Sequence, residues 1–174
     1  MSCAILAGYA LDCKDAVGGI KNIYLAPISD VSAVTENASG YVTGITMVST
    51  KKFYKYALEP RGANSTTQNI QSDPTVGTVA YEQTLTAAFL KMKWETQNKL
   101  QTLVANRTAI LVEMKTGQYF LFGKENGMEV NGGTGTSGAA MNEYNGYSLT
   151  FAGMEKTFAQ EVEPSIVAAL VSAS

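Results

Sequence analysis

The sequence predicts a mainly β protein, a β-sandwich or barrel of antiparallel hairpins with one flanking α-helix. Seven or eight short runs are rich in β-branched and aromatic residues, and several alternate between apolar and polar side chains. Glycine, proline and asparagine separate these runs. Only the segment 93–107 carries apolar residues at helical spacing. We expect one domain over residues 1–174, with an N-terminal arm at 1–19 and a C-terminal arm at 160–174, for which a short helix is the alternative.

Residues 20–60 predict three strands. Residues 20–28 contain a strand that stops at Pro27, and residues 29–40 form a polar connection with one helical turn. The β-rich runs 41–49 and 51–60 are separated by a single residue, which indicates a hairpin.

A second hairpin is predicted for 64–73 and 76–90, with its turn at Asp73-Pro74. The first strand is polar on both faces. The second has an apolar face that includes Leu85 and Phe89 and a face of small polar residues that includes Glu82. It is longer than an ordinary strand, and it carries no lysine or proline that would protect an edge from pairing.

The helix at 93–107 has a narrow apolar stripe formed by Thr96, Leu100, Leu103 and Val104, which suits packing on a sheet. Residues 108–114 and 118–123 then predict an apolar hairpin, and 147–155 the last clear strand.

A glycine-rich segment at 123–146 is expected to be a flexible loop. It has no phosphate-loop pattern and does not open a helix, which excludes a phosphate site. A disordered surface loop and an interface loop both remain possible. Its larger side chains favour an interface, with contacts to another copy from Met128, Val130, Met141 and Tyr144.

The composition argues against catalysis and for assembly. The chain has no histidine, so histidine-based nucleophilic sites are absent, and Cys3 and Cys13 alone cannot form a four-ligand zinc site. These cysteines are expected to be free thiols, with a disulfide as the alternative. Glu125 and Glu129 lie in the glycine-rich segment, where nothing holds them at a working distance. We therefore expect no enzyme, no cofactor and no metal.

The low content of charged residues also favours assembly. Charged residues make up 16% of the chain, well below the usual quarter, and the net charge is −2. A basic run suited to tight DNA binding is absent from the sequence. We see no signal peptide and no membrane span, and expect folding in a cytoplasm.

Several stretches together resemble the tail tube proteins of tailed bacteriophages, particularly those of the Bacteroides-phage type, and their relatives in contractile injection machines. "CKDAVGGIKNIYLAPISDV" (13–31) is similar to their N-terminal entry, and residues 79–130 are similar to their strand–helix–hairpin centre. That centre includes Ala105-Asn106-Arg107 and the stretch 117–123, "GQYFLFG". "NGYSLTFAGME" (145–155) is similar to their closing strand.

The resemblance implies a tail-tube-like domain that assembles into rings, usually hexameric, which stack into a hollow tube for genome delivery. It implies a virion protein assembled in the host bacterial cytoplasm. Its partners would be copies of itself, tape measure, tail terminator and distal tail proteins, and passing DNA that it does not bind specifically. Candidate lumen-facing residues are Thr66, Gln68, Glu82, Thr84 and Thr86. Trp94 and Tyr54 are candidate contacts between subunits, because aromatic residues are enriched at interface centres.

Two other functions remain open. The chain could be a capsid decoration or head–tail joining protein, which would also be β-rich. It could instead be a non-enzymatic binding module, for a sugar for example, that uses exposed tyrosine and tryptophan.

Overall fold

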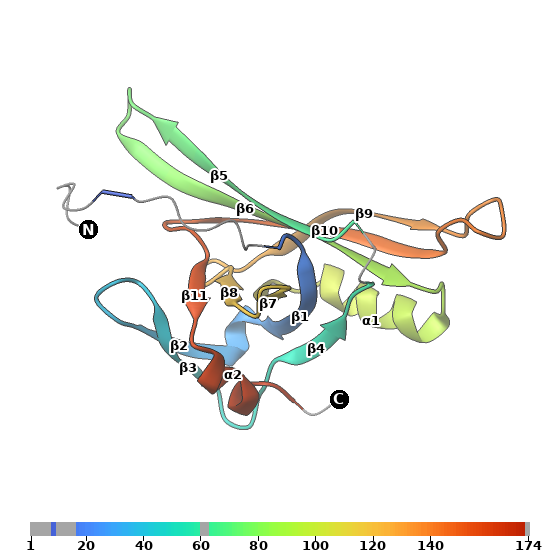
Figure 1. Cartoon of the computed structure of the whole chain (residues 1–174), viewed down its shortest axis with the longest axis horizontal. Coiled ribbons are helices and arrows are strands. Elements are labelled where there is room, and N and C mark those ends of the chain that lie inside the picture. Colours follow the sequence, from blue (N-terminus) through green and yellow to red (C-terminus); the bar gives the residue numbers. More distant parts are fainter. Residues whose placement is uncertain (1–7, 10–16, 60–62, 173–174) are drawn as a thin grey trace.

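A computed structural model describes residues 8–9, 17–59 and 63–172. Most of the expected N-terminal arm, including Cys3 and Cys13, lies outside the described residues. The described residues form two β-sheets that pack as a sandwich without closing into a barrel, and helix α1 (Trp94–Val104) flanks them (Figure 1). The expected fold class, a β-sandwich with a flanking helix, is confirmed.

The larger sheet has seven strands in the order β2-β3-β11-β8-β7-β1-β4. Its strands are antiparallel to their neighbours except where β11 runs parallel to β3. The bounds are β1 (Ile20–Pro27), β2 (Val31–Glu36), β3 (Val42–Met47), β4 (Tyr54–Ala57), β7 (Thr108–Met114), β8 (Tyr119–Phe122) and β11 (Gln160–Val162).

The smaller sheet has four strands in the order β5-β6-β10-β9, and every neighbouring pair is antiparallel. The bounds are β5 (Ser65–Asp73), β6 (Thr78–Leu90), β9 (Glu129–Thr136) and β10 (Gly146–Glu155). The β5–β6 hairpin projects beyond the body of the molecule (Figure 1).

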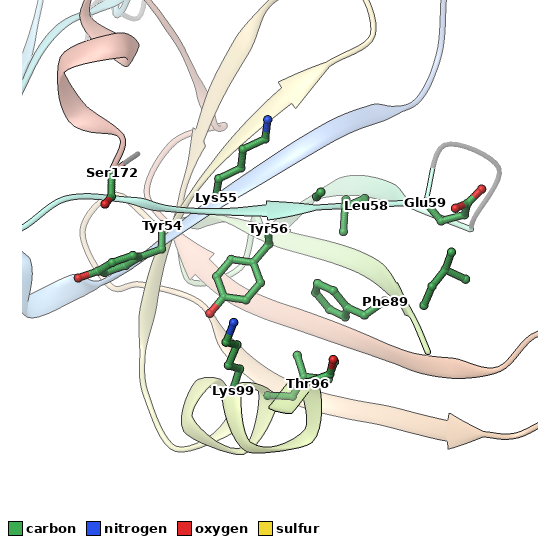
Figure 2. A pocket seen from close by; sticks show the side chains of 12 residues that line it. Tyr54, Lys55, Tyr56, Leu58, Glu59, Phe89, Thr96, Lys99 and Ser172 are labelled. Atoms are coloured by element: carbon green, nitrogen blue, oxygen red, sulfur yellow. The ribbon is translucent and has the colours of Figure 1, made fainter. Parts of the chain in front are cut away.

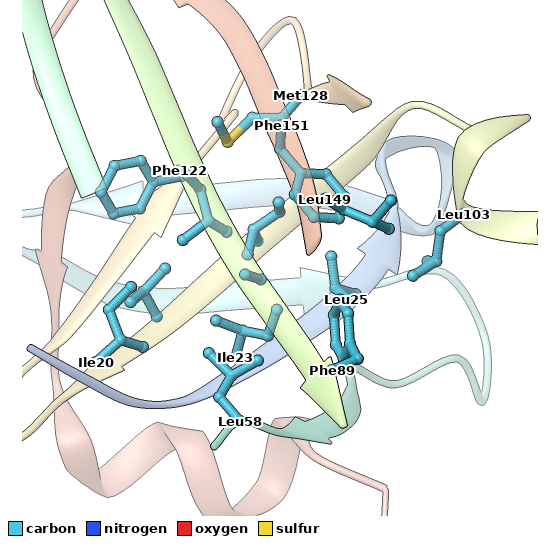
Figure 3. Packing of buried hydrophobic residues seen from close by; sticks show 14 of the residues in the cluster. Ile20, Ile23, Leu25, Leu58, Phe89, Leu103, Phe122, Met128, Leu149 and Phe151 are labelled. Carbon is cyan, nitrogen blue, oxygen red and sulfur yellow. The ribbon is translucent and has the colours of Figure 1, made fainter. Parts of the chain in front are cut away.

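Two apolar clusters hold these elements together. The first lies between the sheets, where Ile23 of β1, Leu85 of β6 and Phe151 of β10 are fully buried. Figure 3 shows Ile23 and Phe151 within this cluster. Leu100 and Leu103 of α1 belong to this cluster, as their helical spacing predicts. The second cluster covers the other face of the larger sheet and includes residues of α2 (Pro164–Leu170).

The hairpin predicted for 41–49 and 51–60 is wrong. Both runs are strands, but β3 pairs with β2 and β11, whereas β4 pairs with β1 at the opposite end of the sheet. After β3, the Val48 N–H donates to the Asp30 carbonyl at 2.8 Å, and the chain then crosses to the far edge. Residue pattern identifies a strand, but its partner depends on the rest of the fold.

Two polar or short segments also differ from the sequence prediction. The expected connection at 29–40 contains the 3-10 helix η1 (Ile28–Asp30) and then β2, whose exposed position at the sheet edge accommodates polar residues. In the C-terminal segment the alternative of a short helix is confirmed, because α2 takes the place of an arm. Residues 160–170 form β11 and α2 against their own chain, with Val162, Val167 and Leu170 buried.

The glycine-rich segment is not a continuous loop, because it contains β9. Gly133 and Gly135 lie against Leu149 and Tyr147 of β10, where a Cβ atom would come within 2.7 and 3.0 Å of those side chains. Glycine is normally unfavourable in a strand, so its abundance here conceals a strand whose close packing requires it.

Candidate assembly surface

The four-stranded sheet has one face on the core and one that no described helix or strand covers (Figure 1). Side chains alternate along a strand, and directly paired residues share a face. Leu85, Ala87 and Phe89 of β6 point into the core, so their neighbours in the strand point outward. We call this uncovered side the outer face. Its members include Thr67, Asn69, Glu82, Thr84, Thr86, Ser148, Thr150 and Ala152.

The outer face is polar and weakly acidic. No lysine or arginine occurs in any of the four strands, which contain the carboxylates Asp73, Glu82, Glu129 and Glu155. On this face Glu82 accepts a hydrogen bond from Gln71 Nε2 at 3.1 Å. At the rim, Arg107 Nη2 lies 2.6 Å from Glu129 Oε1. The central strands contribute mostly small side chains to this face and no cation, and Met154 of β10 is an exposed apolar exception.

Both edges of this sheet are free of described strands. β5 pairs only with β6, and β9 pairs only with β10. Because the four strands alternate in direction, β5 and β9 run in opposite senses. A second copy in the same orientation would therefore place its β5 antiparallel to β9 of the first copy.

The predicted lumen residues divide between the two faces. Glu82, Thr84 and Thr86 lie on the outer face as expected. Thr66 and Gln68 do not, because they pair with Leu85 and Gln83, which point inward. This part of the prediction is corrected. The register of β5 against β6 decides on which face each β5 side chain lies. Because β5 is polar along nearly its whole length, its sequence does not indicate this register.

The inward glutamines have structural partners. Gln83 is buried, its Oε1 accepts a hydrogen bond from the Gly123 N–H at 2.9 Å, and its Nε2 donates to the Thr157 carbonyl at 3.2 Å. Gln68 Oε1 accepts from the Ala159 N–H at 2.6 Å. These bonds attach the two strands to loops beneath the sheet.

The predicted contact residues occupy different environments. Trp94 is 78% exposed, Tyr54 is 53% exposed and Met141 is fully exposed, so each is accessible to a partner. Met128 is fully buried between the sheets, and its predicted role in subunit contact is corrected. The Met128 backbone exchanges two hydrogen bonds with Thr108, at 2.7 and 2.8 Å, and this pairing directs the side chain inward.

Val130 and Tyr144 are intermediate cases. Val130 is partly buried and packs against the first apolar cluster. The Tyr144 hydroxyl lies 2.9 Å from the Phe89 carbonyl oxygen and 2.8 Å from that of Tyr147, and burial raises its pKa. Tyr144 thus anchors the β9–β10 loop to its own sheet.

Sequence reasoning missed part of the outer face, namely Thr67 and Asn69 of β5 and the small residues of β10. A signal for β10 exists in the chain. Ser148, Thr150 and Ala152 alternate there with the buried Leu149 and Phe151.

A groove between β4 and α1 was also not predicted. It has a volume of about 710 Å³, and Tyr54, Tyr56, Phe89 and Lys99 are among the residues that line it (Figure 2). The Tyr56 and Phe89 rings meet edge to face with centroids 6.1 Å apart. Burial raises the pKa of Tyr56.

The buried carboxylate of Glu113 is held by hydrogen bonds from neighbouring side chains. Glu113 receives hydrogen bonds from Asn22 Nδ2 at 2.7 Å, Tyr24 Oη at 2.9 Å and Lys21 Nζ at 2.6 Å. Burial acts to raise the Glu113 pKa, but these three donors outweigh it and lower the pKa. These three donors all belong to β1, which favours a role in joining β7 to β1.

Within the described ranges, histidine, cysteine and carboxylate side chains form no group of three that could hold a metal ion. In the same part of the chain, no helix combines the length and the apolar character needed to cross a membrane.

Comparison with known protein families, curated proteins and solved structures gives no match for this chain.

Proposed function

We propose that this chain is a structural subunit of the tail tube of a tailed bacteriophage. In this proposal, copies join through their four-stranded sheets into rings, hexameric as the sequence resemblance implies, and the rings stack into a conduit for the genome. One observation carries the proposal: a four-stranded antiparallel sheet has two free edges, a core-facing side and a bare side without cations.

The free edges support ring formation. Unpaired strand edges promote association unless they are protected by charge, proline or a covering element. β5 and β9 contain no lysine and no proline. The two edges differ in sequence, so a β5-to-β9 contact is heterologous, and repeating it by rotation closes a ring.

The outer face supports passage of DNA. When the sheets join into a ring with their cores outward, this face lines the bore. A surface without lysine or arginine avoids the counterion release that drives binding to phosphates. Glu82, repeated around the ring, would repel phosphates within the Debye length of about 8–10 Å.

In this setting the protein belongs to the virion tail and is assembled in the host bacterial cytoplasm. Its partners are other copies, tape measure, tail terminator and distal tail proteins. DNA would pass without specific binding.

Two adjacent threonines of β5 provide a matched test. Thr66→Lys places a charge on the inward side of the edge strand, beside the joint between copies, whereas Thr67→Lys places the same charge on the outer face. We expect rings or tubes from the wild-type chain and from Thr67→Lys, but only monomers from Thr66→Lys, because a charge at a buried joint is costly. Electron microscopy and analytical ultracentrifugation measure the outcome.

Circular dichroism and the unfolding midpoint establish that both variants keep the fold. A wild-type chain that stays monomeric at high concentration contradicts the proposal. Equal assembly of the two folded variants contradicts the edge-pairing arrangement.

A further inference from the structure

The groove between β4 and α1 is an apolar surface at one end of the four-stranded sheet. Its lining includes Tyr54 and Tyr56 of β4, Phe89 and Leu90 of β6, and Lys99 of α1. Figure 2 shows Tyr56, Phe89, Thr96 and Lys99 converging on the space between the strand and the helix. β4 is the last strand of its sheet, so one side of it has no described partner strand.

Around this end several large apolar side chains are exposed. Leu90 and Met92 are each 44% exposed, and Trp94 follows them at the start of α1. Such an accumulation on a soluble protein marks an interaction surface.

The opposite end of the sheet is the projecting β5–β6 hairpin, which is also apolar at its end. Ile70, Val76 and Val79 are exposed there, and Ile70 and Val79 share the inward-facing side of the hairpin. Asp73 lies at the turn, and its Oδ1 accepts a hydrogen bond from the Thr75 N–H at 2.8 Å. We call residues 70–79 the hairpin end.

The hairpin end and the groove cannot meet within one chain. β6 spans its 13 residues from Thr78 at the hairpin end to Leu90 at the groove. At about 3.3 Å per residue this strand separates the two by roughly 40 Å. When copies follow one another in the same orientation along the strand direction, the hairpin end of one faces the groove end of the next.

The charges of the two surfaces are complementary. Lys99 lines the groove and has no ion pair with a described residue, and Lys91 and Lys93 lie close by in the chain without ion pairs. Glu59 is the carboxylate among the lining residues. The hairpin, by contrast, has Asp73 and Glu82 and no lysine or arginine from residue 63 to 90.

From these observations we infer that the groove binds the hairpin end of a second copy, with Asp73 of one copy close to Lys99 of the other. The inference rests on the proposed tube, in which that second copy belongs to the adjacent ring. It makes this contact the stacking joint, separate from the β5-to-β9 joint that closes each ring.

Charge reversal with rescue tests the inference. We expect Lys99→Glu and Asp73→Lys each to shorten tubes at least tenfold in mean length while single rings persist. The double variant restores length, because the opposite charges face each other again. Lys52→Glu is the matched control, since Lys52 is an exposed lysine outside the groove and without an ion pair in the described chain.

Tube length by electron microscopy and ring mass by ultracentrifugation are read for every variant, after circular dichroism has established the fold. If folded Lys99→Glu forms tubes of wild-type length, the inference is overturned and the tube proposal stands. The same result is expected if the groove binds a different ligand. Shortening by both single variants without rescue in the double variant also overturns the pairing of Asp73 with Lys99. Absence of rings from the wild-type chain overturns both proposals.

Discussion

Met128 and Met141 are the same residue type in the same glycine-rich segment, yet their environments are opposite. Met128 is fully buried between the sheets, whereas the Met141 side chain is fully exposed on the β9–β10 loop. Burial, rather than residue type, decides whether such a side chain stabilises the subunit or is available to a partner.

We expect Met128→Ala to lower the free energy of unfolding by about 2–5 kcal/mol, because it removes buried apolar contacts and leaves a cavity. Met141→Ala is the control and should change it by less than about 0.5 kcal/mol. Urea denaturation under monomeric conditions measures both. Similar effects from the two substitutions would contradict the buried position of Met128.

Glu113 makes stability depend on pH. Its pKa in the folded chain is lowered from the ordinary value of 4.5, because hydrogen bonds from Asn22, Lys21 and Tyr24 outweigh the opposing effect of burial. A lowered folded pKa contributes stability that is present above the unfolded pKa. That contribution is lost as pH falls through the folded pKa.

Glu113→Gln should therefore lower the free energy of unfolding at pH 7 by about 1–3 kcal/mol, since an amide cannot accept from all three donors. The difference from wild type should be smaller at pH 3, which lies below the ordinary pKa of 4.5, because the stability contributed by the lowered folded pKa declines as pH falls below the unfolded value. Urea denaturation at the two pH values measures this, with Glu95→Gln, exposed on α1, as the control. A difference that does not change with pH would argue against a charged Glu113.

At the scale of elements, β9 depends on glycines at particular positions. A Cβ at Gly133 would lie 2.7 Å from Leu149 Cδ2 and 2.8 Å from the Ser148 carbonyl oxygen, whereas a Cβ at Gly132 meets no atom within 4 Å. Gly133 therefore lies on the closely packed side of the strand, and its neighbour Gly132 lies on the open side. The strand edge that the proposed ring would use therefore depends on the close packing of Gly133 on β10.

Gly133→Ala should lower the free energy of unfolding by about 1–3 kcal/mol through overpacking against β10. It should also speed amide exchange in β9. Gly132→Ala should be neutral or slightly stabilising, because alanine restricts the unfolded chain and has space here. Denaturation and hydrogen exchange by mass spectrometry report the outcome, and protection of β9 in Gly133→Ala equal to wild type would contradict the close packing.

At the scale of the whole molecule, the proposed tube gives the outer face and the two kinds of joint separate roles. The proposed ring uses the sheet edges, the proposed stack uses the groove and the hairpin end, and the outer face is left for the bore. Substitutions on this face should therefore alter contact with DNA and spare assembly.

Tubes of the triple variant Glu82→Lys, Thr84→Lys and Thr86→Lys should form normally and retain double-stranded DNA at low salt. This retention should be lost as salt rises, because it depends on counterion release. Co-sedimentation of tubes with DNA at about 50 and about 200 mM salt measures this retention. Triple-alanine tubes are the control, and lysine tubes that retain no DNA would place this face outside the bore.

Much of the fold follows from local patterns in the chain. The apolar runs 20–27, 108–114 and 119–122, the β5–β6 hairpin and the buried positions of Leu100 and Leu103 in α1 are confirmed, whereas Val104 of the predicted stripe is exposed. In each case alternation or helical spacing concerns residues close in sequence. Neighbouring residues therefore predict these elements and, for the amphipathic strand β6, also its buried side.

Other features depend on contacts between distant residues. β3 and β4 lie apart because their partners come from elsewhere in the chain, and β9 is a strand because β10 lies beside it. The candidate site shows the same division. The outward position of Glu82, Thr84 and Thr86 follows from alternation in an amphipathic strand, but the inward position of Thr66 and Gln68 depends on their register against β6.

The sequence by itself determined the class of fold, the polar side of the strand 76–90 and the absence of cations from 63 to 90, because these are properties of residue order. Only the tertiary structure decided which face each β5 residue takes, where Met128 lies and which strand edges remain open. A strand's partner, its register and the burial of its side chains are set by packing between segments far apart in the chain, and no local pattern carries that information.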